Sequence, residues 1–347
     1  MSLGLVVAIF VAVLPHVADL SEVWRTIGAM TWLELVTLLG AAVWNLVTYW
    51  VLLVVALPGL SLWQAMIVTQ SSTAIANTLP GGPAFGLGLA YRMYASWGLP
   101  RGRIALALVV SGVGDLFAKL GMPIMAVAIL AVGGDADPAL VTASVIGVVV
   151  LVAAVALFVA ALSDERSARR IGWGLARLAS FSLRIVARPP VSDWGEATAR
   201  FRAETTQLLR GRWPLVIGAS LLSHFSLYFV LLLALRHVGV SEADVGWAEV
   251  LGGFAFVRLL SALPLTPGGL GVVELGLSAA LVVAGGAREP VVAAVLLYRA
   301  LTYLLQIPLG AAAYLWWRHS RTSASSEHPQ GPRAGARRED VGRASGS

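Results

Sequence analysis

The chain has 347 residues, of which 58% are hydrophobic and 13% are charged, and it carries a formal net charge of +6 at pH 7. This is more apolar surface than one soluble core needs, and several runs reach the roughly 20 apolar residues that span a bilayer. We therefore predict an all-α, polytopic integral membrane protein. The absence of cysteine excludes disulfides, thiolate nucleophiles and cysteine-based metal sites.

The first half of the chain, 1–162, is predicted to hold four full spans and one interrupted helix. The spans are expected at 3–18, 31–57, 104–132 and 140–162. The run at 3–18 is short and contains Pro15 and His16. A cleaved signal peptide is the alternative for this run, but no basic residue precedes it.

The segment 61–92 differs from these spans because polar residues dilute its apolar background ahead of Pro80, Gly81 and Gly82. These polar residues are Gln64, Gln70, Ser71, Ser72, Thr73, Asn77 and Thr78. Proline removes a backbone donor and fixes φ, and paired glycines admit conformations closed to other residues. We expect a broken or re-entrant helix, because helices that break inside a bilayer usually do so around a binding site or a cavity.

The second half, 213–317, repeats this plan with fewer spans. Full spans are expected at 213–235 and 291–317, and a broken pair at 247–286 surrounds Pro267, Gly268 and Gly269. The connecting loop 163–212 has ten arginines against five acidic residues, a pattern that suits amphipathic helices at the cytoplasmic surface better than nucleic-acid binding. The chain thus forms one transmembrane domain, 1–317, followed by a tail, 318–347, predicted to be disordered.

Charge asymmetry predicts the orientation of the chain. The Arg-rich loop and tail are expected inside, together with Arg92, Arg101 and Arg103, while the connecting loops that carry acidic residues are expected outside. Those acidic residues are Asp19, Glu22, Asp135, Asp137, Glu242 and Asp244. Both termini then lie inside, and the two Pro-Gly-Gly breaks are entered from opposite sides of the plasma membrane.

The spacing of prolines supports an internal repeat. Pro80 and Pro123 are 43 residues apart, and Pro267 and Pro308 are 41 apart. Laying one pair on the other aligns 104–130 with 289–315, although small and apolar segments also look alike by chance. An inverted repeat with broken helices at its interface is a recurring plan of transporters, with the substrate near the bilayer midplane.

Charged residues inside spans are costly unless they are paired or face water. Asp115 and Lys119, the only lysine of the chain, stand four residues apart on one helical face, either as a structural ion pair or as part of a site. An ammonium is a compact partner for a phosphate, which favours the site.

A second group of charges, Arg258, Glu274 and Arg299, flanks the second break. Arg258 with Glu274 could form only a hairpin clasp, and Arg299 could extend to the outer surface, but three charges around one break favour a site. For His224, beside Ser223 and Ser226, an interhelical hydrogen bond is favoured over a site role.

Motifs for catalysis are missing from the sequence. We find no Walker A loop, no H-E-x-x-H and no G-x-S-x-G, and no metal ion or other cofactor is expected. An intramembrane lipid enzyme needs none of these motifs, so it stays an alternative.

At 266–274, Thr-Pro-Gly-Gly-Leu-Gly-Val-Val-Glu, followed by Leu-Leu-Tyr-Arg at 296–299, the chain resembles the lysylphosphatidylglycerol synthase transmembrane-region family, also called flippase-like or UPF0104 proteins. The resemblance extends over most of 1–317. It implies a lipid-translocating module like the flippase part of the multiple peptide resistance factor, with Pro267, Gly268, Gly269, Glu274 and Arg299 as site residues.

This chain departs from the family in two ways. We expect no aminoacyl-transferase domain after the predicted tail, so synthase activity is not implied. The first break, followed by Gly86-Leu87-Gly88, also lacks the acidic residue that many members carry there.

The sequence thus favours a plasma-membrane flippase for a phospholipid or a polyprenyl-phosphate-linked lipid. The expected substrate-binding residues are Arg258, Pro267, Gly268, Gly269, Glu274, Arg299, Asp115, Lys119, Pro80, Gly81 and Gly82. Two alternatives stay open: an intramembrane enzyme or accessory subunit for lipid modification or lipid-linked glycosylation, working with a separate transferase or glycosyltransferase, and a small-solute transporter. No nucleic-acid partner is expected.

Overall fold

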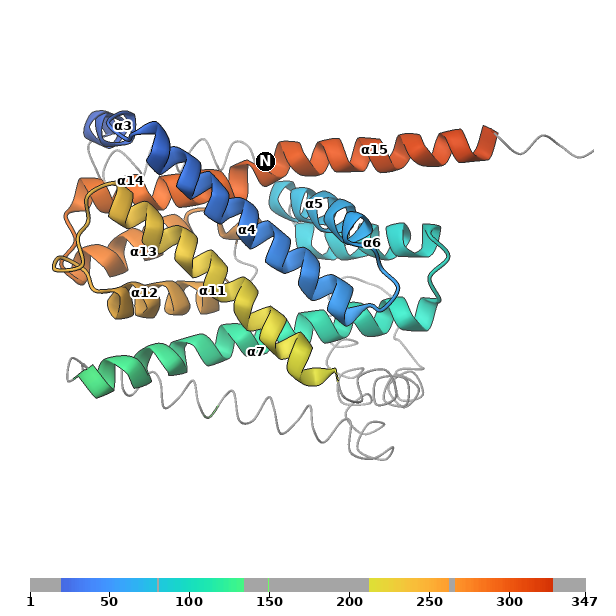
Figure 1. Ribbon diagram of the computed structural model, residues 1–347, viewed down its shortest axis with the longest axis horizontal. Coiled ribbons are helices and arrows are strands. Elements are labelled where there is room, and N and C mark those ends of the chain that lie inside the picture. The colour runs from blue at the N-terminus through green and yellow to red at the C-terminus, as the bar shows by residue number, and fades with distance from the viewer. Residues whose placement is uncertain (1–19, 80, 134–148, 150–211, 262–265, 327–347) are drawn as a thin grey trace, which may run out of the picture.

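The computed structural model describes residues 20–79, 81–133, 149, 212–261 and 266–326. Within these residues every regular element is helical, as the sequence predicts, and the helices form one bundle (Figure 1). In chain order they are α3 (Leu20–Gly28), α4 (Trp32–Ala56), α5 (Leu62–Thr78), α6 (Gly82–Ser96), α7 (Arg101–Gly133), α11 (Trp213–His237), α12 (Trp247–Leu260), η2 (Pro267–Gly269), α13 (Val272–Val283), α14 (Arg288–Arg299), η3 (Ala300–Leu304) and α15 (Gln306–Ser326).

Four helical stretches in the described residues are long and apolar enough to cross a membrane. They are Trp32–Ala56, Arg101–Leu130, Pro214–His237 and Arg288–Arg321, and they match the spans predicted at 31–57, 104–132, 213–235 and 291–317. The spans predicted at 3–18 and 140–162 and most of the basic loop 163–212 lie outside the described residues. Helix α15 continues to Ser326, so the start of the predicted tail is helical.

Side chains of α4 are distributed as expected for a helix in lipid. Its exposed face carries Trp32, Val36, Leu39 and Val43, which are spaced about one turn apart. Its buried face carries polar as well as apolar side chains: Leu38, Ala42, Asn45, Thr48, Leu52 and Ala56. Apolar groups outside and polar groups inside indicate a hydrocarbon surround and a polar interior.

Polar side chains join α4 to α11. Asn45 Nδ2 donates to Ser223 O at 3.0 Å and to Ser226 Oγ at 2.8 Å. Near the other end of the pair, Thr37 Oγ1 lies 3.0 Å from His237 Nε2. The residue numbers rise on one helix as they fall on the other, so α4 and α11 are antiparallel. They lie side by side across the molecule in Figure 1.

Helices α5 and α6 form the first predicted break. The chain reverses at Leu79 and Gly81, where Gly81 has φ +68°, while Pro80 lies outside the described residues. A Cβ on Gly82 would overlap the carbonyl of Ala76, and one on Gly86 would lie 2.6 Å from Ser72 O. The pairing of 82 with 76 and of 86 with 72 makes α5 and α6 an antiparallel hairpin that only small residues allow to pack so closely.

The second break has the same construction. Helices α12 and α13 flank η2, and a Cβ on Gly253 would lie 3.3 Å from Ala280 Cβ. A Cβ on Gly276 would lie 3.1 Å from Val257 Cγ2. These two pairs again define an antiparallel hairpin, centred next to Pro267.

Helices of the two halves pack on each other in matching pairs. The first arm of the first hairpin, α5, packs along α15, the last helix of the second half. In turn α12, the first arm of the second hairpin, packs along α7. With α4 paired to α11, each contact has a counterpart with the halves interchanged, as expected for the predicted inverted repeat.

The last span is interrupted by η3, one π-helical turn between α14 and α15. Leu305 N donates to Ala300 O at 2.9 Å, a bond that reaches five residues back. Pro308 cannot donate to Leu304 O and its ring crowds that carbonyl, so the helix adjusts just before the proline. Such π turns are frequent at functional sites, and here the turn follows Arg299 directly.

Outside the spans, a compact loop connects α11 to α12. Arg236 donates to Val240 O and Ser241 O, each at 2.9 Å, and pairs with Glu242. Asp244 accepts from the hydroxyl and the backbone N–H of Ser241, and these bonds lower the pKa of Asp244 below its usual value. This acidic loop is therefore well structured by its own hydrogen bonds.

Candidate functional site

A cavity of about 640 Å³ lies between the two hairpins. Gly81 and Pro83 line it from the first break, and Gly268 and Gly269 line it from the second. The remaining wall comes from α4, α5, α7, α11, α12, α13 and the α14–η3–α15 helix, so both halves contribute. The two Pro-Gly-Gly segments, far apart in sequence, thus meet at one cavity.

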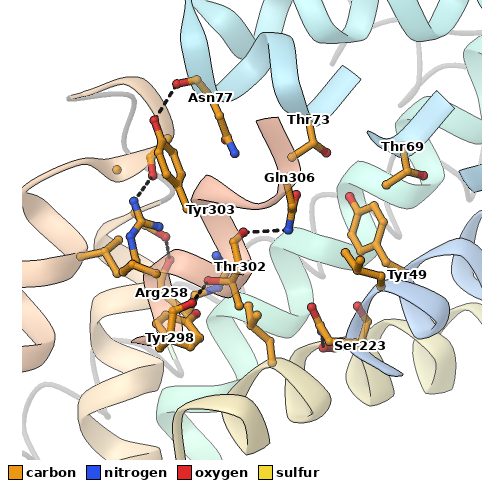
Figure 2. A pocket seen from close by; sticks show the side chains of 18 of the residues that line it. Tyr49, Thr69, Thr73, Asn77, Ser223, Arg258, Tyr298, Thr302, Tyr303 and Gln306 are labelled. Carbon is orange, nitrogen blue, oxygen red and sulfur yellow. Dashed lines mark hydrogen bonds between the residues drawn. The ribbon is translucent and has the colours of Figure 1, made fainter. Parts of the chain in front are cut away.

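The wall from α5 is polar. Thr69, Thr73 and Asn77 follow one another along this helix in Figure 2, and Tyr303 and Gln306 line the cavity beside them. Gln70, also in the wall, is only 3% exposed, and neither its Nε2 nor its Oε1 has a hydrogen-bond partner. Thr69 Oγ1 is buried without a partner as well. Buried polar groups without partners are rare, so these point to a polar ligand or water in the cavity.

At the second break, Glu274 and Arg299 form a buried ion pair. Arg299 Nε donates to Glu274 Oε1 at 2.7 Å, and Gly271 N donates to Glu274 Oε2 at 2.7 Å. Arg299 Nη2 also donates to Gly268 O at 3.1 Å. The pair therefore fixes the start of α13, the backbone of the break and the end of α14 relative to one another. Glu274 binds Arg299, which lines the cavity, but does not itself line it.

Tyr303 connects the two breaks. Its ring lies under the Arg299 guanidinium, with 4.4 Å from Cζ to the ring centroid, and its hydroxyl donates to Asn77 O at 2.7 Å. Gly268, at φ +60°, leaves no room for a side chain, because a Cβ would overlap the Tyr303 ring. Glycine is thus required here both by backbone conformation and by close approach.

Arg258, near the end of α12, is the cation of the cavity that lacks a partner. Among the described residues, no hydrogen bond or ion pair of its guanidinium is found, and its Nε is buried without a partner. The hairpin clasp between Arg258 and Glu274, which the sequence left open, does not form, because Glu274 pairs with Arg299. Arg299 also does not extend to the surface, since it is buried.

Asp115 and Lys119 form the expected ion pair on α7, with Nζ 2.6 Å from Oδ2. Lys119 lines the main cavity, whereas Asp115 lines a second cavity of about 260 Å³. Tyr49, Thr69, Thr73 and Pro83 border both. The ion pair therefore lies in the wall between two cavities.

His224 on α11 approaches the same ion pair, a contact that the sequence did not predict. Its Nε2 lies 3.2 Å from Asp115 Oδ1, and its Nδ1 lies 2.9 Å from Ser220 O. The expected interhelical hydrogen bond of His224 is not found among the described residues: its contact with α7 is an ion-pair contact, and its hydrogen bond to Ser220 O stays within α11.

The predicted site residues are largely brought together. Those that line the main cavity are Gly81, Lys119, Arg258, Gly268, Gly269 and Arg299. Glu274 lies behind Arg299, Asp115 borders the second cavity, and Gly82 packs on Ala76 instead of facing the cavity. Pro267 begins η2, and Pro80 lies outside the described residues.

Sequence reasoning missed the roles of Gln70, Tyr303 and Gln306 in the wall. Gln70, Thr73 and Asn77 were noted as polar, and their spacing of three and four residues places them on one face of α5. That spacing is the feature that could have identified the wall. In the part of the chain that the structure describes, no group of three or more His, Cys, Asp or Glu side chains could hold a metal ion.

Comparison with known proteins gives one family. The family model described as the lysylphosphatidylglycerol synthase TM region matches residues 1–310, which is most of the chain, while no curated protein matches it. The match agrees with the membrane helices found here and ties the protein to lipid modification or transport. On this evidence the chain belongs to the lysylphosphatidylglycerol synthase TM region family.

Proposed function

We propose that this protein translocates a lipid with an anionic phosphate headgroup, a phospholipid or a polyprenyl-phosphate-linked lipid, between the leaflets of the plasma membrane, with both termini inside. The headgroup enters the main cavity and the acyl or prenyl chains stay in lipid. The observation that carries the proposal is the unpartnered Arg258 in a polar cavity shared by both helix breaks.

The charges of the cavity favour an anion. Glu274 neutralises Arg299 and Asp115 neutralises Lys119, which leaves the guanidinium of Arg258 as the excess charge. An unpaired cation inside a membrane protein is costly, and a bound phosphate would remove that cost through charge-assisted hydrogen bonds. A phosphodiester carries one negative charge, which matches this excess.

The uncharged polar side chains of the cavity wall favour a ligand with a polar headgroup. The partnerless Gln70 amide and Thr69 hydroxyl offer both donors and acceptors, which suits glycerol or sugar hydroxyls. A volume of about 640 Å³ is in the range of small-molecule sites, which hold a headgroup but not long chains.

The proposal is tested by reconstitution into phosphatidylcholine vesicles that contain fluorescent phosphatidylglycerol, with chemical quenching of the outer leaflet. Arg258→Gln should slow translocation by roughly tenfold or more, as expected when a charged hydrogen bond is lost. Arg288→Gln is the matched control, because Arg288 is exposed at the start of α14 and should keep the wild-type rate. Equal rates for wild type and Arg258→Gln would overturn the assignment of the site.

The same vesicles separate the alternatives. Uptake of a soluble solute with no lipid movement would indicate a small-solute transporter. Conversion of the labelled lipid when a donor is supplied would indicate an intramembrane enzyme, and conversion only with an added transferase would indicate an accessory subunit. Unchanged translocation in a double Glu274→Ala, Arg299→Ala variant would remove those two residues from the site.

A further inference from the structure

His224 and Asp115 face each other in an arrangement that an added proton would stabilise. His224 Nδ1 lies 2.9 Å from the carbonyl of Ser220, and because a carbonyl only accepts, Nδ1 carries a hydrogen. Nε2 then faces Asp115 Oδ1 at 3.2 Å. The contact is not aligned as a hydrogen bond, so Nε2 has an ion-pair neighbour but no hydrogen-bond partner. In a neutral imidazole, the electron-rich Nε2 would lie 3.2 Å from a carboxylate oxygen, and the two would repel.

Neighbouring charges leave one oxygen of the Asp115 carboxylate to His224. Lys119 pairs with the other oxygen of Asp115, Oδ2, which keeps the carboxylate ionised. His224 is 3% exposed, so bulk solvent screens the contact only weakly. In the part of the chain that the structure describes, the other titratable or charged residues lining the two cavities beside the pair are Tyr49 on α4, Tyr94 on α6, Arg258 on α12, Tyr298 and Arg299 on α14, and Tyr303 in η3. None of these offers a carboxylate that could replace Asp115.

The position of the pair gives a proton access from one cavity to the other. Asp115 borders the second cavity, and His224 and Lys119 border the main cavity. The side chain of Asp115 is 27% exposed, so a proton from water in the second cavity can reach it. His224, on the far side of the carboxylate, can then receive that proton at Nε2.

We propose that Asp115 and His224 form a proton-binding site in the wall of the main cavity, and that its occupancy strengthens anion binding there. On loading, one proton passes from water to His224 Nε2, which becomes an imidazolium paired with the Asp115 carboxylate, while Nδ1–H stays on Ser220 O. On release, the proton returns to water and the imidazole is neutral. Loading adds one positive charge beside the headgroup cavity, so proton binding and anion binding favour each other.

The site itself is tested without any lipid substrate. The wild-type protein, labelled with nitrogen-15 at its five histidines, is placed in nanodiscs and titrated over about pH 5 to 8 by NMR, the range in which histidine usually changes charge. The His224 signal is assigned by its loss in His224→Gln. At a pH where wild-type His224 is protonated, Asp115→Asn should reduce the protonated fraction at least about fivefold, because the stabilising carboxylate is gone.

His237→Gln serves as the control, since His237 lies on the same helix and contacts Thr37 instead of the cavities. It should leave the His224 titration unchanged. A wild-type His224 that stays neutral down to pH 5, or one that titrates identically in Asp115→Asn, overturns the proposal. The first of these outcomes needs no variant, so a misfolded mutant cannot hide it.

The coupling to transport rests on the proposed function and has a separate readout. In phosphatidylcholine vesicles with fluorescent phosphatidylglycerol, the wild-type rate should change at least about threefold between pH 8 and pH 6, and His224→Gln should show no such dependence. Equal pH dependence in both overturns the coupling. A wild type that moves no lipid at any pH, but whose His224 titration depends on Asp115, contradicts the proposed function and supports the proton site.

Discussion

At the scale of single residues, the cavity is organised by which cation has an acidic partner. Glu274 could pair with Arg258 or with Arg299 as far as the sequence tells, since both flank the same break. The structure selects Arg299, because α14 returns alongside α13 and brings its guanidinium to 2.7 Å from the carboxylate. Helical spacing predicts neighbours on one helix, such as Asp115 and Lys119, but not partners from two helices. For that reason the unpaired state of Arg258 could not be predicted.

The Glu274–Arg299 pair should be essential for stability. Glu274→Ala leaves Arg299, whose side chain is 10% exposed, without its carboxylate, and breaking a buried ion pair costs about 3–5 kcal/mol. We expect a clearly lower thermal unfolding midpoint in detergent. The double variant Glu274→Ala, Arg299→Met should recover part of this loss, because no buried charge remains. Glu289→Ala in the first turn of α14 is the control, and a midpoint equal to it would contradict the prediction.

At the scale of elements, the sequence predicted the breaks well and their packing poorly. Proline and paired glycine mark where α5 and α12 must end, because their effect is local. The same locality explains why the four described spans were found within a few residues of their observed ends. Nothing local indicates that α5 packs on α15, more than 200 residues away, so the polar wall facing Tyr303 and Gln306 was missed.

Close packing of the first hairpin should depend on Gly86 but not on the nearby Gly88. Gly86→Ala would place its Cβ 2.6 Å from Ser72 O, and relieving this overlap requires the two arms to separate, at a cost of about 1–3 kcal/mol. The expected result is a lower unfolding midpoint and slower lipid translocation. Gly88→Ala on the same helix has no atom within 4 Å of its Cβ and should be neutral or slightly stabilising. Indistinguishable midpoints for the two variants would show that the hairpin arms do not pack as described.

At the scale of the whole molecule, the inverted repeat explains why the site lies where it does. The first arm of each hairpin packs on a long helix of the other half, α5 on α15 and α12 on α7, so the two breaks lie close together. The two halves of the repeat differ in their charged residues. The position in the first half that corresponds to Glu274 is Leu87, an exposed apolar residue, and the charges there are Asp115 and Lys119. The fold is thus nearly symmetric, but the two halves supply different chemistry to one cavity.

The inverted arrangement also predicts a specific membrane topology. Since α4 and α11 are antiparallel, the loop between α6 and α7, which contains Pro100, and the loop between α11 and α12, which contains Ala243, should lie on opposite sides, with Pro100 inside and Ala243 outside according to the charges of their loops. The chain has no cysteine, so single Pro100→Cys and Ala243→Cys variants report directly, and both positions are exposed. A membrane-impermeant maleimide should label only Ala243→Cys in intact cells and both variants after permeabilisation. Labelling of both in intact cells, or of Pro100→Cys alone, would be incompatible with this orientation, because the basic Arg101 and Arg103 predict the Pro100 loop inside and the acidic Glu242 and Asp244 predict the Ala243 loop outside.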